Sequence, residues 1–488
     1  MRKFILLITL ATFAFTSQSY SAERRSKSMQ SKEVTVSSIK ELKPYLRMDS
    51  VTVTMTPGVY RITADDVKSG KFPRNTEVRE GQITHALILL EGNNSTYNME
   101  GVTIEVETGV PSAFEGSKYF EVAELHYIGN YNVVKGLTLV NVGSIHQNPR
   151  FGWCNVVMDG ISNRAEGIEV RSCGSMPYGY GEVFGKGSGA KISHRKHSSW
   201  LVRGDDNYVK DCRIIQRSYG HYLFIQGAVG VTIEGCYIEG DMVSTEQILA
   251  EKGTGSKADK VGFETVFGYK LPEGYTLSTG EDGIRTYGDG TTYINGKSIK
   301  RRTEGAIVIK DCVVKHARSG ISLTLGGGTR YVENCTLIGC QDGYSINNGG
   351  KIVNCRADAE FGPALRFVSD RDRDAEIDIT IIPYEGERKF SGNGSKHLAH
   401  IFGSGHNITL RKGKGLKVEQ GMCIAVGGDS YTIGNLAKQE NYKATNVTLT
   451  NETDYPIVID DNATNVKIVT GRGVDISDSG ANSSIKIK

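Results

Sequence analysis

One short phrase that ends in cysteine recurs along the chain and constrains its fold more than any other feature. Each copy carries an apolar residue three positions before the cysteine and another two positions after it. A short strand repeated with a fixed inward pattern is the sequence signature of a solenoid. The copies end at Cys212, Cys236, Cys312, Cys335 and Cys355, and a sixth copy has Ile168 in the cysteine position.

The spacing of these copies predicts coils built from three short strands. Cys212 and Cys236 are 24 residues apart, and Cys335 and Cys355 are 20 apart. Three strands of roughly 4–6 residues, with their turns, need about this length. The segments between the copies show no helical period of apolar residues, which argues against an α/β leucine-rich coil. We therefore predict an all-β fold, a single-stranded right-handed parallel β-helix with long loop insertions, whose hand follows the usual hand of parallel β crossovers.

Five of the nine cysteines occupy one equivalent inward position in this scheme. In an exported protein, disulfides would be the first expectation. A thiol that recurs at one buried position of successive coils is better explained as a small core residue. We therefore predict an unpaired cysteine ladder and keep a disulfide framework as the alternative.

Asparagine recurs at the corner that precedes a strand, at Asn132, Asn163 and Asn207. Asparagine tolerates the left-handed bend of such a corner, and stacked amides can hydrogen-bond from coil to coil. The sequence therefore predicts an asparagine ladder along this corner.

The N-terminus has the pattern of a cleavable secretory signal. Arg2 and Lys3 precede an apolar run from Phe4 to Phe15, and small residues lie just before Ala22. This pattern predicts a signal peptide over residues 1–22, a disordered linker over 23–32 and a β-helix domain over 33–488. The mature protein is then expected to be periplasmic or secreted.

The charge of the chain is nearly balanced, with 58 Lys and Arg against 55 Asp and Glu and a net charge of +3. A net charge this small excludes nucleic-acid binding driven by bulk charge. After the signal sequence, no apolar run is long enough to span a membrane. Ten basic residues lie between Lys186 and Arg217. This concentration favours a site for an anionic ligand, with a solvated surface as the alternative.

Three insertions interrupt the coils near the middle of the chain, at residues 175–193, 244–280 and 288–303. Long excursions from a regular scaffold are usually functional loops. We expect the insertions to wall one cleft, and the alternative is that they only decorate the surface.

Counting back sixteen residues from successive cysteine positions aligns the residues of neighbouring coils. The count places His197 over His221 and Trp153 under His197. Two histidines in one strand ladder would lie about 4.8 Å apart. Ile284 and Ile321 fall near the same line. A pair of buried, hydrogen-bonded histidines therefore remains the alternative to a functional pair.

Further polar side chains lie at the corners beside this line and on the strand that follows it. Asp282 and Asp342 each precede a glycine and could be turn residues. Arg318 could be a solvated corner, and Glu281 and Asp282 with Arg285 could form a structural ion pair. The set comprises Arg217, Tyr219, Glu281, Asp282, Arg285, Tyr287, His316, Arg318 and Asp342.

The signal sequence, the asparagine-cornered coils with their cysteine ladder and the basic middle together resemble the pectate-lyase-like superfamily of right-handed parallel β-helix proteins. The resemblance covers nearly the whole mature chain at the level of its repeat, and no single family within the superfamily matches. It implies a secreted enzyme that binds glycans in a groove on the outside of the helix. Most such enzymes are lyases acting on polyuronates, with hydrolases and epimerases as minorities. Because a fold does not determine a function, this implication is an analogy.

A uronate lyase removes the C5 proton and expels the C4 substituent, so it needs a base and a cation that neutralises the carboxylate. Arginine and lysine suit the second role. The catalytic candidates are Lys196, His197, Arg217, His221, Arg285 and Arg318, with His221 or Lys196 as the base and Arg217, Arg285 or Arg318 as the neutralising cation. The substrate-binding candidates are Trp153, His194, Tyr219, Tyr222, Glu281, Asp282, Tyr287 and His316, of which Trp153, Tyr222 and Tyr287 could stack on sugars.

Two other functions stay open at this point. A glycoside hydrolase needs two carboxyl groups at a set separation, and Glu281 would need a partner such as Asp342. A non-catalytic glycan-binding protein is the third possibility. Glu281, Asp282 and Asp289 are few ligands for calcium, so we predict no metal and no cofactor and keep a calcium ion as a weakly supported alternative. The expected partner is an anionic polysaccharide or oligosaccharide bound by a monomer, with no nucleic-acid or membrane partner.

Overall fold

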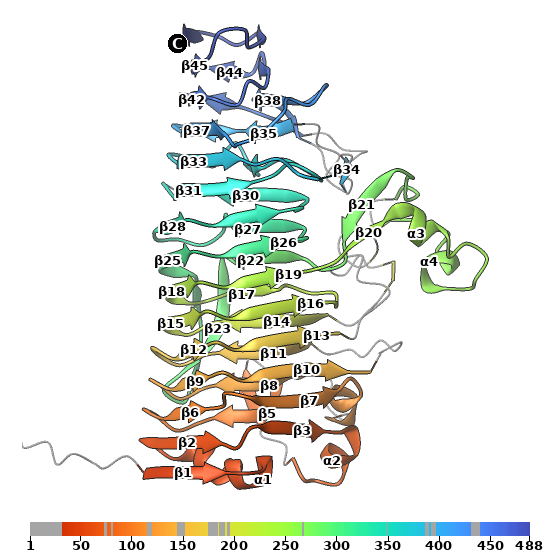
Figure 1. The fold of residues 1–488 in the computed structure, drawn as a ribbon, viewed down its shortest axis with the longest axis vertical. Helices are drawn as coiled ribbons and strands as arrows, with labels where there is room; N and C mark the ends of the chain where they lie inside the picture. The colour runs from red at the N-terminus through yellow and green to blue at the C-terminus, as the bar shows by residue number, and fades with distance from the viewer. Residues whose placement is uncertain are drawn as a thin grey trace, which may run out of the picture.

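The computed structural model describes residues 32–72, 76–79, 82–114, 120–143, 152–173, 184, 191–192, 196–265, 268–347, 349–385, 390–391, 397–430 and 440–488. The predicted signal peptide and all but the last residue of the predicted linker lie outside these residues. Successive coils stack into one elongated, right-handed parallel β-helix, which confirms the predicted fold (Figure 1). No helix in the described part of the chain is long and apolar enough to cross a membrane.

Two long sheets form the stack, and the main hydrophobic core lies inside it. One sheet has 23 strands and receives two strands from most coils. The other has 14 strands, which pair in parallel except for the antiparallel pair β4 and β5. The 14-stranded sheet contains β4 (Thr76–Arg79), β5 (Gln82–Leu90), β8 (Phe120–Tyr127), β11 (Gly152–Met158), β14 (His197–Val202), β17 (Leu223–Ile225), β22 (Asp282–Thr286), β27 (Ser319–Leu323), β30 (Asp342–Ile346), β32 (Leu365–Arg366), β35 (His397–Ile401), β38 (Cys423–Val426), β43 (Ile457–Ile459) and β46 (Ile476–Asp478).

The 23-stranded sheet forms the remaining long face of the stack, and short helices lie beside the first coils (Figure 1). These helices are α1 (Ile39–Leu42), η1 (Lys43–Arg47), α2 (Ala64–Lys68) and η2 (Val110–Phe114). The strands of the sheet are β1 (Lys32–Val36), β2 (Val51–Met55), β3 (Gly58–Ile62), β6 (Thr96–Asn98), β7 (Val102–Glu107), β9 (Val133–Lys135), β10 (Thr138–Val142), β12 (Arg164–Glu166), β13 (Glu169–Ser172), β15 (Asp205–Lys210), β16 (Arg213–Gln216), β18 (Val229–Glu234), β19 (Tyr237–Glu239), β25 (Glu304–Lys310), β26 (Val313–Lys315), β28 (Arg330–Glu333), β29 (Thr336–Ile338), β31 (Lys351–Ala357), β33 (Glu376–Ile381), β37 (Asn407–Lys412), β42 (Thr448–Asn451), β45 (Lys467–Thr470) and β47 (Ser484–Ile487).

The cysteine phrase marks one corner of the coil. The five ladder cysteines are buried free thiols, as the sequence predicts, and the other four cysteines are free thiols as well. The residue just before each ladder position takes a left-handed backbone conformation, for example Asp211 (φ 51°), Gly235 (φ 67°) and Asn334 (φ 54°). Glycine, asparagine and aspartate adopt this conformation at low cost, which explains why the phrase has one of them at that position.

The predicted asparagine ladder forms at a second corner. The backbone N–H of Ser95 donates to Asn132 Oδ1 (3.1 Å), that of Asn132 to Asn163 Oδ1 (2.9 Å), and that of Asn163 to Asn207 Oδ1 (2.8 Å). The left-handed residue is not the asparagine but its predecessor, such as Asp206 (φ 50°). The asparagine is therefore selected for its buried amide rather than for its backbone freedom.

Replacing Asn163 by alanine is expected to lower the free energy of unfolding by roughly 2–5 kcal/mol, because it leaves several buried backbone groups without a partner. The Nδ2 of Asn163 donates to the carbonyls of Gly129 and Asp159, both at 2.8 Å. Denaturant titration followed by circular dichroism measures the loss. The control Asn407→Ala removes an exposed asparagine and is expected to change stability by about 0.5 kcal/mol or less. Equal losses in the two variants would contradict a stabilising ladder.

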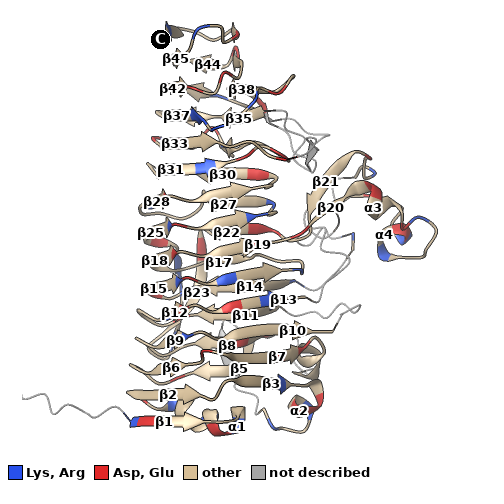
Figure 2. Cartoon of the chain, viewed as in Figure 1, with Lys and Arg blue, Asp and Glu red and all other residues tan. Residues whose placement is uncertain are grey.

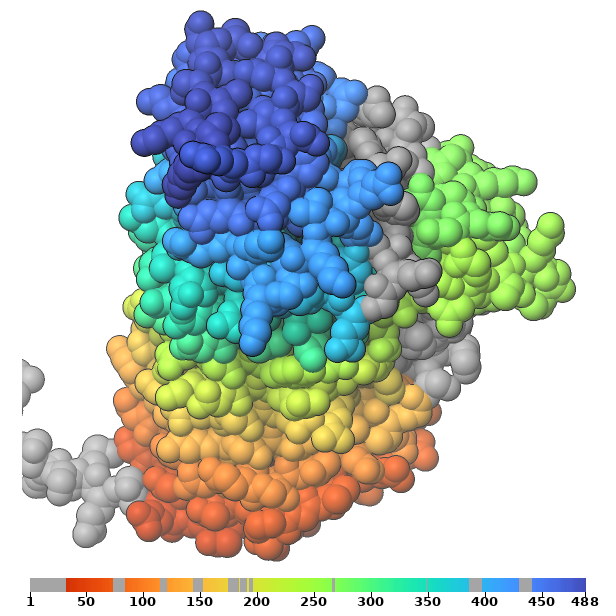
Figure 3. Space-filling view, turned by 45° about the horizontal axis from the view of Figure 1, so that its top comes forward, coloured from red at the N-terminus to blue at the C-terminus, as the bar shows by residue number. Residues whose placement is uncertain are grey.

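The insertion at residues 244–280 forms a small lobe on one side of the stack (Figures 1 and 3). Its apolar cluster includes Ile248 and Phe263, and it also takes in Phe184 and Ile192 from the insertion at 175–193. The two insertions therefore share one core. The lobe contains β20 (Met242–Ser244), α3 (Thr245–Leu249), α4 (Lys257–Lys260) and β21 (Tyr275–Ser278), which pairs with β34 (Phe390–Ser391).

The insertion at residues 288–303 is an antiparallel hairpin of β23 (Asp289–Ile294) and β24 (Lys297–Arg302). It lies against the outside of earlier coils, because Asp159 Oδ1 accepts the backbone N–H of Tyr293 at 2.9 Å and Arg301 is paired with Asp205. The hairpin thus ties several coils together. Basic and acidic residues are mixed over the whole stack, in agreement with the small net charge (Figure 2).

Candidate active site

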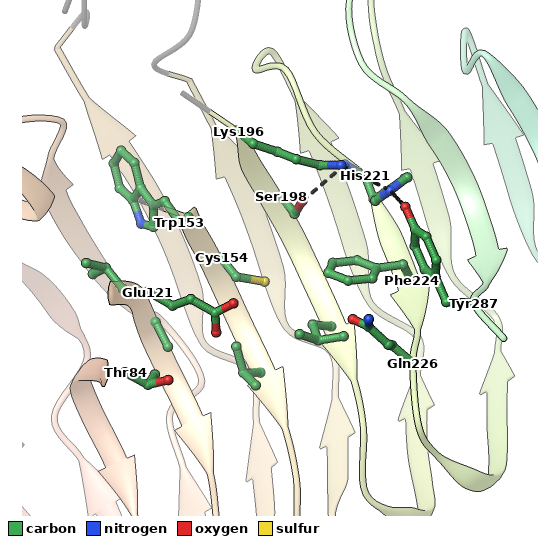
Figure 4. Close-up of a pocket in the computed structure, with 15 residues that line it drawn as sticks. Thr84, Glu121, Trp153, Cys154, Lys196, Ser198, His221, Phe224, Gln226 and Tyr287 are labelled. Atoms are coloured by element: carbon green, nitrogen blue, oxygen red, sulfur yellow. Dashed lines mark hydrogen bonds between the residues drawn. The ribbon is translucent and has the colours of Figure 1, made fainter. Parts of the chain in front are cut away.

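A groove of about 310 Å³ runs over the outer face of the 14-stranded sheet. Its floor is a small apolar cluster that lies outside the main core and includes Cys154, Val157, Leu201 and Phe224. Lys196, His221 and Tyr287 converge at one end, and Thr84 and Glu121 lie at the other (Figure 4). None of the described lining residues belongs to the three insertions. The expectation that the insertions wall the cleft is wrong for those at 244–280 and 288–303 and stays a prediction for residues 175–193, most of which lie outside the described residues.

The register of β14 and β17 decides which histidine reaches the groove. Trp200 pairs with Leu223 and Leu201 with Phe224, so Ser198 rather than His197 lies beside His221. Ser198 Oγ accepts the backbone N–H of His221 at 3.2 Å. Counting sixteen residues back from the cysteine positions is therefore wrong by one residue between these two strands. A shift of one residue in a strand turns a side chain to the opposite face of the sheet.

His197 points inward and is completely buried. Its Nδ1 lies 2.9 Å from the carbonyl oxygen of Cys173, and its Nε2 lies 3.1 Å from Asn155 Oδ1. Its ring stacks on Trp153 at a centroid distance of 3.8 Å, which confirms the predicted contact of these two residues. The structure therefore gives His197 a place in the core, and we remove it from the catalytic candidates.

Trp153 and Tyr222 also point inward and cannot serve as sugar platforms. Trp153 is only 2% exposed, and its Nε1 donates to Glu124 Oε1 at 3.0 Å. Tyr222 is fully buried, with its hydroxyl 3.1 Å from Ser278 Oγ. Trp153 borders the groove but is almost completely buried, whereas Tyr287 is partly exposed and lines the end of the groove.

An ionic cluster surrounds His221 at the end of the groove. Lys196 Nζ lies 2.5 Å from Glu281 Oε2, and the same carboxylate oxygen lies 3.0 Å from His221 Nε2. Although burial alone raises the pKa of Glu281, its interactions with His221 and with the ammonium of Lys196 hold that pKa well below its usual value. Glu281 is therefore ionised and anchors the ammonium of Lys196, which is 41% exposed.

Two arginines complete the cluster by pairing with Asp282. Arg285 Nη1 lies 2.6 Å and Arg318 Nη2 3.0 Å from Asp282 Oδ2. Burial raises the pKa of Asp282, but the charges of Arg318 and Arg285 outweigh it and lower that pKa far below its usual value. The ion-pair alternative for Asp282 and Arg285 is confirmed, so neither arginine is a free cation aimed at the groove.

His221 and Tyr287 are in direct hydrogen-bond contact, with 2.6 Å between His221 Nε2 and the Tyr287 hydroxyl. Burial lowers the pKa of His221 in spite of the neighbouring Glu281. Burial raises the pKa of Tyr287 to about 12. At neutral pH the pair is therefore a neutral imidazole next to a protonated phenol. Such a pair can move a proton between a substrate and the imidazole.

The remaining predicted residues lie at the edge of the site or away from it. Tyr219 is buried, with its ring 5.9 Å from Lys196 Nζ. Arg217 pairs with Asp241 at 3.0 Å, on the corner between β16 and β17, and does not line the groove among the described residues. His316 occupies the same corner in a left-handed conformation (φ 55°). We therefore remove Arg217 and His316 from the site, and His194 lies outside the described residues.

The groove contains residues that the count along the sequence did not select. Glu121, Phe224 and Gln226 line it together with the apolar floor. They occupy outward positions of β8 and β17 or follow β17 directly. A signal for them exists in the alternation along each strand, but only the correct register shows which side of the strand faces outward.

A hard metal ion finds no open oxygen set at Glu281 and Asp282, because both carboxylates are occupied by cationic side chains. Asp289, the third possible ligand, is an exposed residue at the start of the hairpin. Within the described residues, no three side chains of His, Cys, Asp or Glu gather in a way that could hold a metal. These residues therefore do not fit a calcium centre, and no catalytic step is derived through one.

No family model and no curated protein matches the chain. Among solved structures, the chain is similar to the alginate lyase AlyF-OU02 in complex with G6, with 12% identity, a TM-score of 0.45 and coverage of 93% of this chain and 84% of that one. It is also similar to a PL6-family polysaccharide lyase from Pseudopedobacter saltans, with 14% identity, a TM-score of 0.37 and coverage of 93% and 92%. A GH87 α-1,3-glucanase from Streptomyces thermodiastaticus has 11% identity, a TM-score of 0.31 and coverage of 88% and 63%.

Proposed function

We propose that the protein is a secreted or periplasmic polysaccharide lyase that cleaves a uronic-acid-containing chain by β-elimination. The observation that carries this proposal is the 2.6 Å contact between the Tyr287 hydroxyl and His221 Nε2 at the end of the groove, beside the ammonium of Lys196. Elimination from a uronate requires a base at C5 and a cation for the carboxylate, and these three side chains supply both.

Tyr287 and His221 act together as the base in this mechanism. The Tyr287 oxygen takes the C5 proton while its own proton passes to His221 Nε2. The C5–H electron pair forms the C4–C5 double bond, and the C4–O bond breaks. The proton then returns through Tyr287 to the leaving oxygen. His221 becomes an imidazolium between Glu281 Oε2 (3.0 Å) and Asp282 Oδ2 (3.6 Å), and both carboxylates stabilise that charge.

Lys196 neutralises the substrate carboxylate. It is the most exposed cation of the cluster, with 41% of its side chain accessible, against 27% for Arg285 and 14% for Arg318. The two arginines pair with Asp282 and so keep its carboxylate ionised and fixed beside His221. Their role is positioning rather than contact with the substrate.

The hydrolase alternative has less support from this geometry. A glycosidase needs one carboxyl group that is protonated at the working pH. Surrounding cations hold the pKa values of Glu281 and Asp282 below the usual range, so neither can act as the acid. Asp342 is paired with Arg366 at 2.9 Å.

Incubation with a panel of uronate polysaccharides is expected to release products that absorb in the ultraviolet, because elimination leaves a conjugated C4–C5 double bond. Absorbance and reducing ends are measured in the same samples. Reducing ends without absorbance indicate hydrolysis and reject the lyase mechanism. Binding without either product across the panel indicates a non-catalytic glycan-binding protein.

A further inference from the structure

A second hollow lies at the N-terminal end of the stack. Its volume is about 300 Å³, which is at the lower end of the range for ligand pockets. Two of its walls are η1, which carries Lys43 and Arg47, and β5, which carries Leu89. Lys40 and Phe72 also line it. This cap hollow, as we call it, therefore combines apolar and basic side chains.

The apolar floor of the groove connects the proposed catalytic pair with the cap hollow. At one end, the ring of Phe224 lies 6.1 Å from the ring of Tyr287, measured between centroids. The strand register places Leu201 beside Phe224 and Val157 beside Leu201. Leu89 belongs to the same apolar cluster and also lines the cap hollow. A glycan chain that lies along this floor therefore reaches the cap hollow.

The strand spacing gives the length of chain that this path requires. The path crosses the sheet from β17 over β14, β11 and β8 to β5, which are neighbours in that order. Adjacent strands lie about 4.8 Å apart, so the path spans roughly 19 Å, or about four pyranose units. A trimer bound at the catalytic pair therefore ends on the floor, whereas a hexamer can enter the cap hollow.

Three cationic side chains line the cap hollow. Arg47 pairs with Glu91 at its margin. The ammonium of Lys43 lies 4.2 Å from the centroid of the Phe72 ring, and burial lowers the pKa of Lys43. A carboxylate beside that ammonium would offset its loss of solvation. Lys40 is exposed and lines the same hollow, so its ammonium can contact the same carboxylate.

We propose that the cap hollow is a distal subsite, in which Lys40 and Lys43 bind the carboxylate of a uronate about four units from the one held at His221 and Tyr287. The protein then binds long uronate chains more tightly than short ones. This inference rests on the proposed function for the place of cleavage and adds a second contact on the same chain. The alternative is a solvated basic surface that contacts no ligand.

The test uses trimers and hexamers of galacturonate and of mannuronate. Calorimetry measures their binding to the intact protein carrying His221→Gln, which should not cleave them, and ultraviolet absorbance with the wild type reports elimination. For at least one of the two sugars, we expect the hexamer to bind about 10-fold more tightly than the trimer. Adding Lys40→Glu should lower the hexamer affinity about 10-fold and leave the trimer affinity unchanged, and Lys40→Gln should lower the hexamer affinity less.

The control Lys467→Glu makes the same charge change at an exposed lysine of β45, near the C-terminal end of the stack (Figure 1). It should leave both affinities unchanged. Added salt should reduce the advantage of the hexamer, because it screens the attraction between the lysines and the carboxylate.

The two proposals fail in different ways in this experiment. Equal affinities for trimer and hexamer, no binding of any of the four oligosaccharides, or equal losses in Lys40→Glu and Lys467→Glu overturn the distal subsite, whether or not unsaturated product forms. A hexamer advantage that Lys40→Glu removes, without any unsaturated product from the wild type, overturns the elimination mechanism and supports the distal subsite.

Discussion

The variant His221→Gln is expected to lower kcat about 10²–10⁴-fold, the range that a positioned acid–base group contributes. Glutamine keeps a polar side chain in the site but cannot accept the proton that Tyr287 passes to Nε2, 2.6 Å away. Tyr287→Phe should lower kcat by a similar factor, since it removes the hydroxyl oxygen that takes the proton from C5. The double variant should lose no more than the worse single variant, because the two groups act as one unit. Initial rates from ultraviolet absorbance give these values.

The control His316→Asn changes a histidine on the corner outside the groove to a residue that tolerates its left-handed backbone (φ 55°). It should keep near wild-type rates. The pH profile adds a second readout. His221 must be neutral to accept the proton, and burial lowers its pKa. Activity should therefore persist below pH 6.5, the usual value for histidine, and fall only when His221 becomes protonated. Full activity in His221→Gln, with the fold retained, would reject the proposed dyad.

Replacing Asp282 by asparagine is expected to lower the free energy of unfolding by roughly 3–5 kcal/mol, the cost of breaking a buried ion pair from one side. Asp282 is 1% exposed and is the shared partner of Arg285 (2.6 Å) and Arg318 (3.0 Å). Asparagine has nearly the same shape but leaves two clustered arginines without that charge. Denaturant titration at neutral pH measures the difference. Activity should fall as well, because the imidazolium loses one of its two carboxylates.

The pH dependence of this effect has a definite sign. Because the pKa of Asp282 is lower in the folded than in the unfolded chain, its ionisation stabilises the fold above the unfolded value of about 3.9. That stabilisation is lost as the pH falls towards the folded pKa, so the wild type and Asp282→Asn should converge in acid. Asp289→Asn, an exposed aspartate seven residues further along the chain, is the matched control and should change stability by about 0.5 kcal/mol or less. A constant difference between the wild type and Asp282→Asn at all pH values would contradict the ion-pair explanation.

The repeating features of the fold were predictable because each repeats a local constraint. A buried thiol follows a left-handed Gly, Asp or Asn at the ladder positions, as at Asp211 and Cys212. Asn163 and its equivalents satisfy the backbone of the neighbouring coil. Such patterns are visible in a sequence because the same positions are buried in successive coils. The same spacing also predicts that Trp153 lies next to His197 on the neighbouring coil, and the two rings are stacked.

The site was predictable in part. Lys196, His221, Glu281, Asp282, Arg285, Tyr287 and Arg318 all fall within the predicted candidates, and the structure brings them together. His197 and Tyr222 were expected to be functional, yet their side chains point into the core. Glu121 and Phe224 were not selected, yet they line the groove.

The sequence by itself determined the solenoid, its coil length, its unpaired cysteines and the segment of the chain where polar chemistry gathers. Tertiary structure alone decided which of those polar residues face the groove. The reason is that the pitch of a coil tolerates one extra residue in a turn, whereas the facing of a side chain in a strand reverses with each residue. One extra residue between β17 and Cys236 shifts the register of β17 against β14, so His197 points into the core while His221 lies beside Tyr287. The 2.6 Å contact between His221 and Tyr287 forms only when the coils are stacked.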